Sequence, residues 1–139
     1  MALLVPNVGE EVMIQAILDL DLDLRLFTNN HTPVDTDVVG DYVEATFAGY
    51  AEIPLVSANW VVTPGDPASA AYPDIVFTRT VSGALQTVYG YYVVQRVSEV
   101  LMWAELFSDN DPTNAPYDMV NLGDTITLPP RFTLRDEQD

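Results

Sequence analysis

The spacing of apolar residues near the start of the chain is helical. Between residues 8 and 18, apolar side chains recur three and four positions apart, at Val8, Val12, Met13, Ala16, Ile17 and Leu18. Asn7 is a residue type that caps helix N-termini, and Glu10 follows three positions later, as in a capping box. The pattern predicts one short helix over residues 8–18, capped by Asn7.

The period then changes from helical to alternating. Residues 18–26 place leucine at every second position, and this period of two is typical of a strand. The other face carries Asp19, Asp21 and Asp23, with Arg25 after them. Neighbouring carboxylates on a strand lie roughly 7 Å apart and do not converge on a point, as calcium ligands must. We therefore interpret residues 18–26 as a half-buried strand with a solvated acidic face.

Short apolar runs separated by turn residues fill the remainder of the chain. The runs lie at 50–56, 59–63, 71–80, 87–97, 100–107 and 124–134. Pro54 indicates an edge strand or a bulge, and Pro129 with Pro130 interrupts the last run. Run 87–97 is apolar at nearly every position, which suits a central strand, and it pairs with run 100–107 as a hairpin. The acidic segment 34–46 reads as a long loop with one helical turn.

These elements predict an all-β fold class, specifically a β-sandwich of about seven or eight strands with one short N-terminal helix. Apolar residues make up 48% of the 139, enough for a hydrophobic core in one domain over residues 1–139. Residues 1–6 precede the helix as an apolar arm, and residues 135–139 form an acidic tail.

The net charge and the amino-acid composition exclude several kinds of functional site and binding partner. There are 21 acidic residues against five arginines, so the net charge is −16, and the chain has neither lysine nor cysteine. Cysteine nucleophiles, zinc–thiolate sites, disulfides and Schiff-base lysines are excluded. A strongly acidic chain also predicts no nucleic-acid partner and no anionic membrane partner. The first six residues lack the basic start and long apolar run of a secretory signal, so we expect synthesis in a host cytoplasm.

Few residues are candidates for a chemical site. An acidic loop offers oxygen ligands for calcium at Asp109, Asp111, Asn114 and Asp118, but it lacks the glycine and terminal glutamate of an EF-hand. We prefer to interpret that loop as ordinary turns, in which Asp and Asn side chains hydrogen-bond to the nearby backbone. His31 is the single histidine, and no serine has the setting of a nucleophile elbow. The sequence therefore predicts no enzyme and no cofactor.

Aromatic residues and arginines remain as candidates for binding. A carbohydrate platform could use the aromatic residues Trp60, Trp103, Tyr89, Tyr91 and Tyr92, although core packing is the commoner role. Arginines surrounded by so many acids are expected to pair with carboxylates, within the domain or across an interface, at Arg79, Arg96, Arg131 and Arg135. The interface candidates are the arm and the last two arginines: Leu3, Leu4, Val5, Pro6, Arg131 and Arg135.

Four short motifs resemble small virion proteins of tailed phages, including cyanophages. They are Leu4-Val5-Pro6-Asn7-Val8-Gly9-Glu10, Tyr89-Gly90-Tyr91-Tyr92-Val93, Leu101-Met102-Trp103-Ala104-Glu105 and Asn121-Leu122-Gly123-Asp124. The resemblance is greatest to capsid decoration, or cement, proteins. It implies a structural protein on the outer capsid surface of a virion that binds the major capsid protein, stabilises capsomer junctions and forms a homo-oligomer, a trimer or dimer. Two alternatives stay open: a tail, neck or fibre-attachment component, and a module that binds glycans or a host surface.

Overall fold

A computed structural model describes residues 4–65, 67–109 and 112–134 of the chain. Within these ranges the elements are α1 (Asn7–Leu18), β1 (Leu22–Phe27), η1 (Val39–Asp41), β2 (Ile53–Leu55), η2 (Ser57–Asn59), β3 (Val61–Thr63), β4 (Ala68–Ala71), β5 (Ile75–Thr78), β6 (Gln86–Val88), β7 (Gly90–Gln95), β8 (Leu101–Leu106), η3 (Phe107–Asp109), β9 (Tyr117–Met119), β10 (Thr125–Leu128) and β11 (Arg131–Leu134). The all-β fold class with one short N-terminal helix is confirmed.

The described part of the chain contains eleven strands, where the sequence predicted seven or eight. Three predicted runs are each divided in two. Run 71–80 contains the end of β4 and all of β5, run 87–97 contains most of β6 and all of β7, and Pro129–Pro130 separates β10 from β11. A proline has no backbone N–H to donate to a ladder, which explains the last division.

The chain divides into two compact units. One is built from residues 4–20, 56–75 and 128–134, and the other from residues 21–55 and 76–127. A single domain over residues 1–139 stays a prediction.

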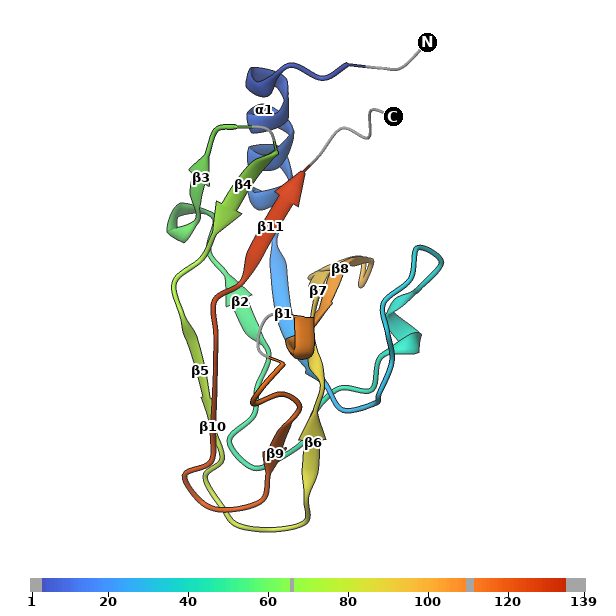
Figure 1. Cartoon of the computed structure of the whole chain (residues 1–139), viewed down its shortest axis with the longest axis vertical. Coiled ribbons are helices and arrows are strands. Elements are labelled where there is room, and N and C mark those ends of the chain that lie inside the picture. The colour runs from blue at the N-terminus through green and yellow to red at the C-terminus, as the bar shows by residue number, and fades with distance from the viewer. Residues whose placement is uncertain (1–3, 66, 110–111, 135–139) are drawn as a thin grey trace. The chain divides into compact units, whose positions relative to one another are not determined.

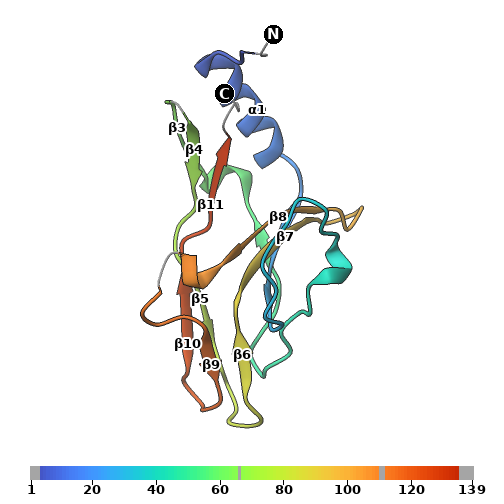
Figure 2. The same ribbon diagram turned by 45° about the vertical axis from the view of Figure 1, so that its right-hand side comes forward.

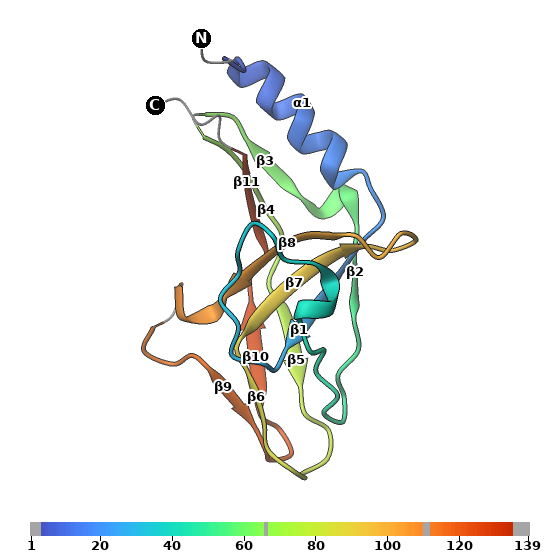
Figure 3. The same ribbon diagram turned by 90° about the vertical axis from the view of Figure 1, so that its right-hand side faces the viewer.

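In the first unit, α1 packs on a three-stranded sheet. The strand order is β11-β4-β3, both pairings are antiparallel, and α1 contacts all three strands. Figure 1 shows α1 (blue) alongside β4 and β11, and Figure 3 shows β3 below it. Ile14 and Leu18, one helical turn apart, are fully buried against this sheet.

The prediction that Asn7 caps α1 is wrong. Asn7 already lies inside the helix, the cap position is held by Pro6, and no side chain caps this end. The Pro6 carbonyl accepts a hydrogen bond from the Glu10 N–H at 3.0 Å. This bond starts the helical ladder one residue earlier than the capping-box pattern requires, so Asn7 is not available as a cap.

The second unit contains a four-stranded antiparallel sheet in the order β2-β1-β7-β8. Run 87–97 does supply a central strand, since β7 lies between β1 and β8 and is buried at five of its six positions. Runs 87–97 and 100–107 form the predicted hairpin, seen as β7 and β8 side by side in Figure 2. Pro54 lies on β2 at a sheet edge, as its missing N–H predicts.

The solvated acidic face predicted for residues 18–26 is only partly correct. The strand begins at Leu22, so Asp19 belongs to the C-cap of α1, where it is exposed. Asp21 is also exposed, but Asp23 is only 3% exposed, because β1 lies between two strands and is covered on both faces. Arg96 compensates the buried charge, with its Nη2 3.0 Å from an Asp23 carboxylate oxygen.

Candidate functional site

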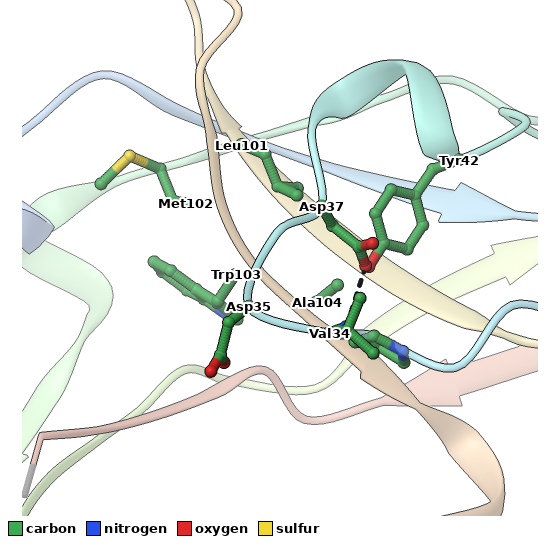
Figure 4. Close-up of a pocket in the computed structure, with 9 residues that line it drawn as sticks. Val34, Asp35, Asp37, Tyr42, Leu101, Met102, Trp103 and Ala104 are labelled. Atoms are coloured by element: carbon green, nitrogen blue, oxygen red, sulfur yellow. Dashed lines mark hydrogen bonds between the residues drawn. The ribbon is translucent and has the colours of Figure 1, made fainter.

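A groove lies beside β8 in the second unit. It has a volume of about 300 Å³ and lies between strand β8 and the loop of residues 33–42. Figure 3 shows that loop crossing in front of β7 and β8, and Figure 4 shows the groove itself. Its lining comprises Pro33, Val34, Asp35, Asp37, Tyr42, Leu101, Met102, Trp103 and Ala104. We call it the Trp103 groove.

An irregularity in β8 shapes the floor of this groove. Trp103 pairs with Val93 and Leu101 pairs with Val94, so Met102 is an extra residue on β8. A bulge of this kind breaks the alternation of a strand. It places Leu101 and Ala104 on the same side, against the aromatic cluster around Tyr42. Because β8 is also an edge strand, all six of its residues are half-buried.

The wall of the groove is held in place by Asp37. Its side chain is only 6% exposed and accepts three hydrogen bonds, from the Tyr42 hydroxyl at 2.7 Å, the Val34 N–H at 3.0 Å and His31 Nε2 at 2.8 Å. The Tyr42 bond lowers the pKa of Asp37, burial opposes it, and the Val34 and His31 bonds add to the lowering. Asp37 thus fixes the loop as a charged anchor.

Tyr42 joins this loop to the core of the sheet. Its ring stacks on Tyr92 at a centroid distance of 5.1 Å and meets Phe27 edge-on at 5.0 Å. Burial, and then the hydrogen bond to Asp37, raises the pKa of Tyr42 well above its ordinary value. The hydroxyl therefore stays protonated and continues to donate to Asp37 at physiological pH. Figure 4 shows this contact at one end of the groove.

A second hollow of about 280 Å³ adjoins the groove and shares Asp37 and Leu101 with it. Val38, Val39, Glu99 and Val100 complete its lining. Glu99 is in turn held by Arg25, whose Nη1 lies 2.9 Å from it while Nε lies 2.8 Å from Glu52. Burial lowers the pKa of Arg25, but Glu99 and Glu52 raise it by more, so this arginine is permanently charged.

The Trp103 groove has the chemistry of a binding site for a side chain or a sugar. Its walls are aliphatic and aromatic, and Asp35 adds an exposed carboxylate. Figure 4 shows Asp35, Trp103 and Met102 toward the end away from Tyr42. A cation can contact an aromatic ring and a carboxylate together, and sugars likewise combine ring stacking with hydrogen bonds. The sequence singled out Trp103 but neither Asp35 nor Asp37.

The aromatic residues proposed as one platform lie in different surroundings. Trp60 is buried and packs edge-on against Tyr72 in the first unit. Tyr91 and Tyr92 are buried in β7. The platform is therefore wrong as a set, because central strands bury aromatic residues on both faces. Trp103 lines the groove beside β8.

The arginine side chains of the second unit bind two kinds of acceptor, carboxylates and backbone carbonyls. Arg96 pairs with Asp23, and Arg25 with glutamates, as expected in an acidic chain. Arg79 instead is buried and donates to the backbone carbonyls of Val81, Ala84 and Met119, so its predicted carboxylate pairing is wrong. Arg131 is exposed on β11. Arg135 lies outside the described residues.

The proposed calcium loop can be followed only in part, because Asp111 lies outside the described residues. Asp109 is exposed at the end of η3, and Asn114 is exposed in the following turn. Asp118 lies on β9, where it accepts a hydrogen bond from the Thr87 hydroxyl at 2.8 Å. Across the described ranges, no group of three potential metal-ligating side chains lies close enough to hold an ion.

The interface candidates at the N-terminus lead directly into α1. Leu4 is exposed, Val5 lies against Gly9, and Pro6 is the helix cap. Leu3 lies outside the described residues. So do residues 1 and 2 of the arm and the whole tail, residues 135–139. No helix in the described part of the chain is long and apolar enough to cross a membrane.

No protein-family model, no curated protein and no solved structure matches this chain.

Proposed function

We propose that the protein is a structural binding protein of a phage virion, a decoration or cement protein on the capsid surface. The observation that carries this proposal is the Trp103 groove, a cavity of about 300 Å³ beside an edge strand in a chain of net charge −16. The four sequence motifs that resemble phage virion proteins are the reason for proposing a virion as the location. Two of them, at residues 89–93 and 101–105, coincide with the β7–β8 hairpin beside the groove.

The charge of the chain suggests the partner's chemistry. Arg25 and Arg96 are already engaged by carboxylates and Arg79 by carbonyls, whereas Asp35 is exposed at the groove. An arginine or lysine side chain of a capsid protein would meet the Trp103 ring and the Asp35 carboxylate together. Long-range attraction to a basic surface would bring the acidic protein to it.

Copy number in purified particles tests the proposed location. Quantitative mass spectrometry of gradient-purified virions from the source should find this chain within a few-fold of the major capsid protein. A ratio of a few per cent would instead favour the alternative of a tail, neck or fibre-attachment component. Complete absence from the particles would overturn the virion proposal.

Groove variants test the proposed binding surface. Trp103→Ala and Asp35→Lys should each weaken binding to particles that lack the protein by about tenfold or more, as loss of a central contact does. Asp74→Lys is the matched control, since Asp74 is exposed and the charge change is the same. Equal binding by all three variants would exclude the groove as the contact.

Glycan binding is the second candidate function, and the exposed Asp35 carboxylate in the same groove as Trp103 is the observation that favours it. A glycan array probed with the wild-type protein and with Trp103→Ala distinguishes the two functions. Binding to a defined sugar that depends on Trp103, without binding to particles, would support the glycan module.

A further inference from the structure

The Trp103 groove runs along the open edge of a sheet. Strand β8 is last in the order β2-β1-β7-β8, so it pairs with β7 on one side only. Four consecutive residues of β8, 101–104, line the groove. Figure 4 shows Ala104 toward Tyr42 and Trp103 on the other side. Because neighbouring side chains of a strand point to opposite faces, a lining that includes both must follow the edge of the strand.

The register of the β7–β8 hairpin shows which backbone groups face this edge. The Phe107 N–H donates to the Tyr89 carbonyl at 2.9 Å. In an antiparallel ladder every second residue bonds to the neighbouring strand, so residues 103, 105 and 107 face β7. The N–H and C=O groups of Ala104 and Leu106 therefore point away from β7. No described residue forms a hydrogen bond with these four groups.

The two edges of this sheet differ in how well they are protected from further pairing. At the other edge, β2 is three residues long and contains Pro54, and short strands and prolines both block the addition of a strand. Strand β8 is six residues long and contains neither proline nor lysine. Its bulge at Met102 limits regular pairing to residues 103–106. The edge of β8 is therefore open to a further strand over these residues.

We propose that the Trp103 groove binds its partner as an added strand, an extended peptide segment that pairs with β8 and carries an arginine or a lysine. Outward backbone groups two residues apart are matched by the N–H and C=O groups of an extended chain. A sugar has no such row of donors and acceptors at a repeat of roughly 7 Å. The proposal rests on the proposed function in taking the groove as the contact, and it adds the form of the partner.

The register also places the basic side chain of that segment. In a strand antiparallel to β8, the residues opposite Ala104 and Leu106 point toward the aromatic cluster around Tyr42, so they should be apolar. The residue opposite Trp103 points to the other side, where Asp35 lies (Figure 4). A guanidinium there can contact the Trp103 ring and the Asp35 carboxylate together.

A synthetic hexapeptide, acetyl-Thr-Val-Thr-Val-Arg-Thr-amide, is the probe for this mode of binding. Aligned antiparallel to β8, its valines pair with Leu106 and Ala104 and its arginine lies opposite Trp103. NMR titration of the whole protein should show saturable binding, and exchange of the Ala104 and Leu106 amide protons with water should slow about tenfold or more as they become hydrogen-bonded. Absence of binding at millimolar peptide, or binding that leaves both amide protons unprotected, would overturn the proposal.

Two N-methylated peptides of identical composition test whether the backbone is what binds. Methylation of the second valine nitrogen removes a donor that faces β8 and should weaken binding about tenfold or more. Methylation of the arginine nitrogen removes a donor that faces away from β8 and should change binding by less than about threefold. Equal affinities of the two methylated peptides would contradict strand addition.

The variant Ala104→Pro makes the same deletion on the protein. Proline lacks the N–H that faces the groove, and edge strands accept proline at such positions. The variant should bind the peptide about tenfold or more weakly, whereas Ala104→Ser keeps the N–H and should bind like the wild type. Circular dichroism checks both folds, and if Ala104→Pro does not fold, the methylated pair decides. Wild-type affinity of a folded Ala104→Pro would refute the added strand.

Particle binding distinguishes failure of this proposal from failure of the proposed function. If Trp103→Ala and Asp35→Lys lose particle binding but the wild type does not bind the peptide, the added strand is refuted and the proposed function stands. If the peptide binds as expected but both variants bind particles like the wild type, the added strand is supported and the proposed function is refuted.

Discussion

At the scale of single residues, Arg79 has the most demanding environment. Its guanidinium is buried, and it donates to the carbonyls of Val81 and Ala84, in the turn that follows it, and to the carbonyl of Met119, 40 residues further along the chain. Gly83 lies so close that an added Cβ would be 2.6 Å from Arg79 Nη2. A larger residue at position 83 would displace the guanidinium, so the close approach favours glycine there. Arg79 organises the turn after β5 through hydrogen bonds to backbone carbonyls.

Replacing Arg79 with methionine should destabilise the protein by about 3 kcal/mol, because it keeps the side-chain length but removes hydrogen bonds to three carbonyls, of which the Met119 carbonyl is in a buried contact. Urea unfolding measures the change. Val76→Met, at an exposed position of β5, is the control and should change stability by no more than about 0.5 kcal/mol. Equal stability of Arg79→Met and the wild type would mean that water can replace the guanidinium.

Glu10 differs from Arg79, because it is a buried charged residue with a carboxylate oxygen that lacks a hydrogen bond from the described residues. It is 1% exposed on the sheet side of α1, and its Oε2 accepts no hydrogen bond from the described residues. Replacement by methionine, of similar length, should stabilise the protein by about 1 kcal/mol, since an unsatisfied buried oxygen is removed. Thermal unfolding tests this, with Glu11→Met as control, and a lower melting temperature for Glu10→Met would contradict it.

At the scale of elements, period and composition predict which segments are regular but not which faces are buried. The helical spacing of residues 8–18 and the apolar run 87–97 were enough for α1 and β7. The outward position of Val8 and Val12 could not be predicted, because α1 is apolar on both sides. Burial of Asp23 depends on Arg96, 73 residues further along the chain, and alternation alone carries no information about that pair.

The Trp103 groove could not be predicted from the sequence for a similar reason. Its walls come from residues 33–42 and 101–104, which are far apart in the chain. The turn residues Asn29–Pro33 indicated a loop, but the bulge at Met102 and the anchoring of Asp37 arise only when the two segments meet. Trp103 and His31 were singled out from the sequence for their chemistry, and residues 101–104 were noticed only as part of a motif that resembles phage proteins.

The loop of residues 33–42 should make stability depend on pH through Asp37. Its folded-state pKa is below the usual value, so its contribution is complete above about pH 4 and is lost as the pH falls through the folded pKa. Asp37→Asn should be less stable than the wild type at neutral pH, and the difference should shrink on acidification. Urea midpoints at successive pH values measure this, with the exposed Asp35→Asn as control; a difference independent of pH would contradict it.

At the scale of the whole molecule, the net charge of −16 is the dominant physical feature. Repulsion among carboxylates opposes the folded state at neutral pH, and the ion pairs of Arg25 and Arg96 relieve only part of it. Salt shortens the range of that repulsion. The protein is thus expected to be more stable in salt, unlike a protein held together by surface ion pairs.

Raising NaCl from about 20 to about 300 mM at pH 7 should stabilise the protein by about 1 kcal/mol, because the screening length falls several-fold. Thermal unfolding at low micromolar concentration measures this change. At a pH near the isoelectric point of about 4.1, the net charge vanishes and the salt effect should vanish with it. Destabilisation by salt at pH 7 would show that the arginine pairs outweigh the repulsion.

The engagement of the arginines also determines how the folded protein meets a protease. Trypsin cleaves after lysine or arginine, and this chain has no lysine. Arg25, Arg79 and Arg96 all belong to the second unit and are all held by carboxylates or carbonyls. Arg96 lies in the exposed turn between β7 and β8, so trypsin can cleave after it in the folded protein. Arg25 and Arg79 are largely covered, and cleavage after either requires the second unit to open first. The rate of tryptic cleavage after Arg25 and Arg79 would therefore report how often that unit opens.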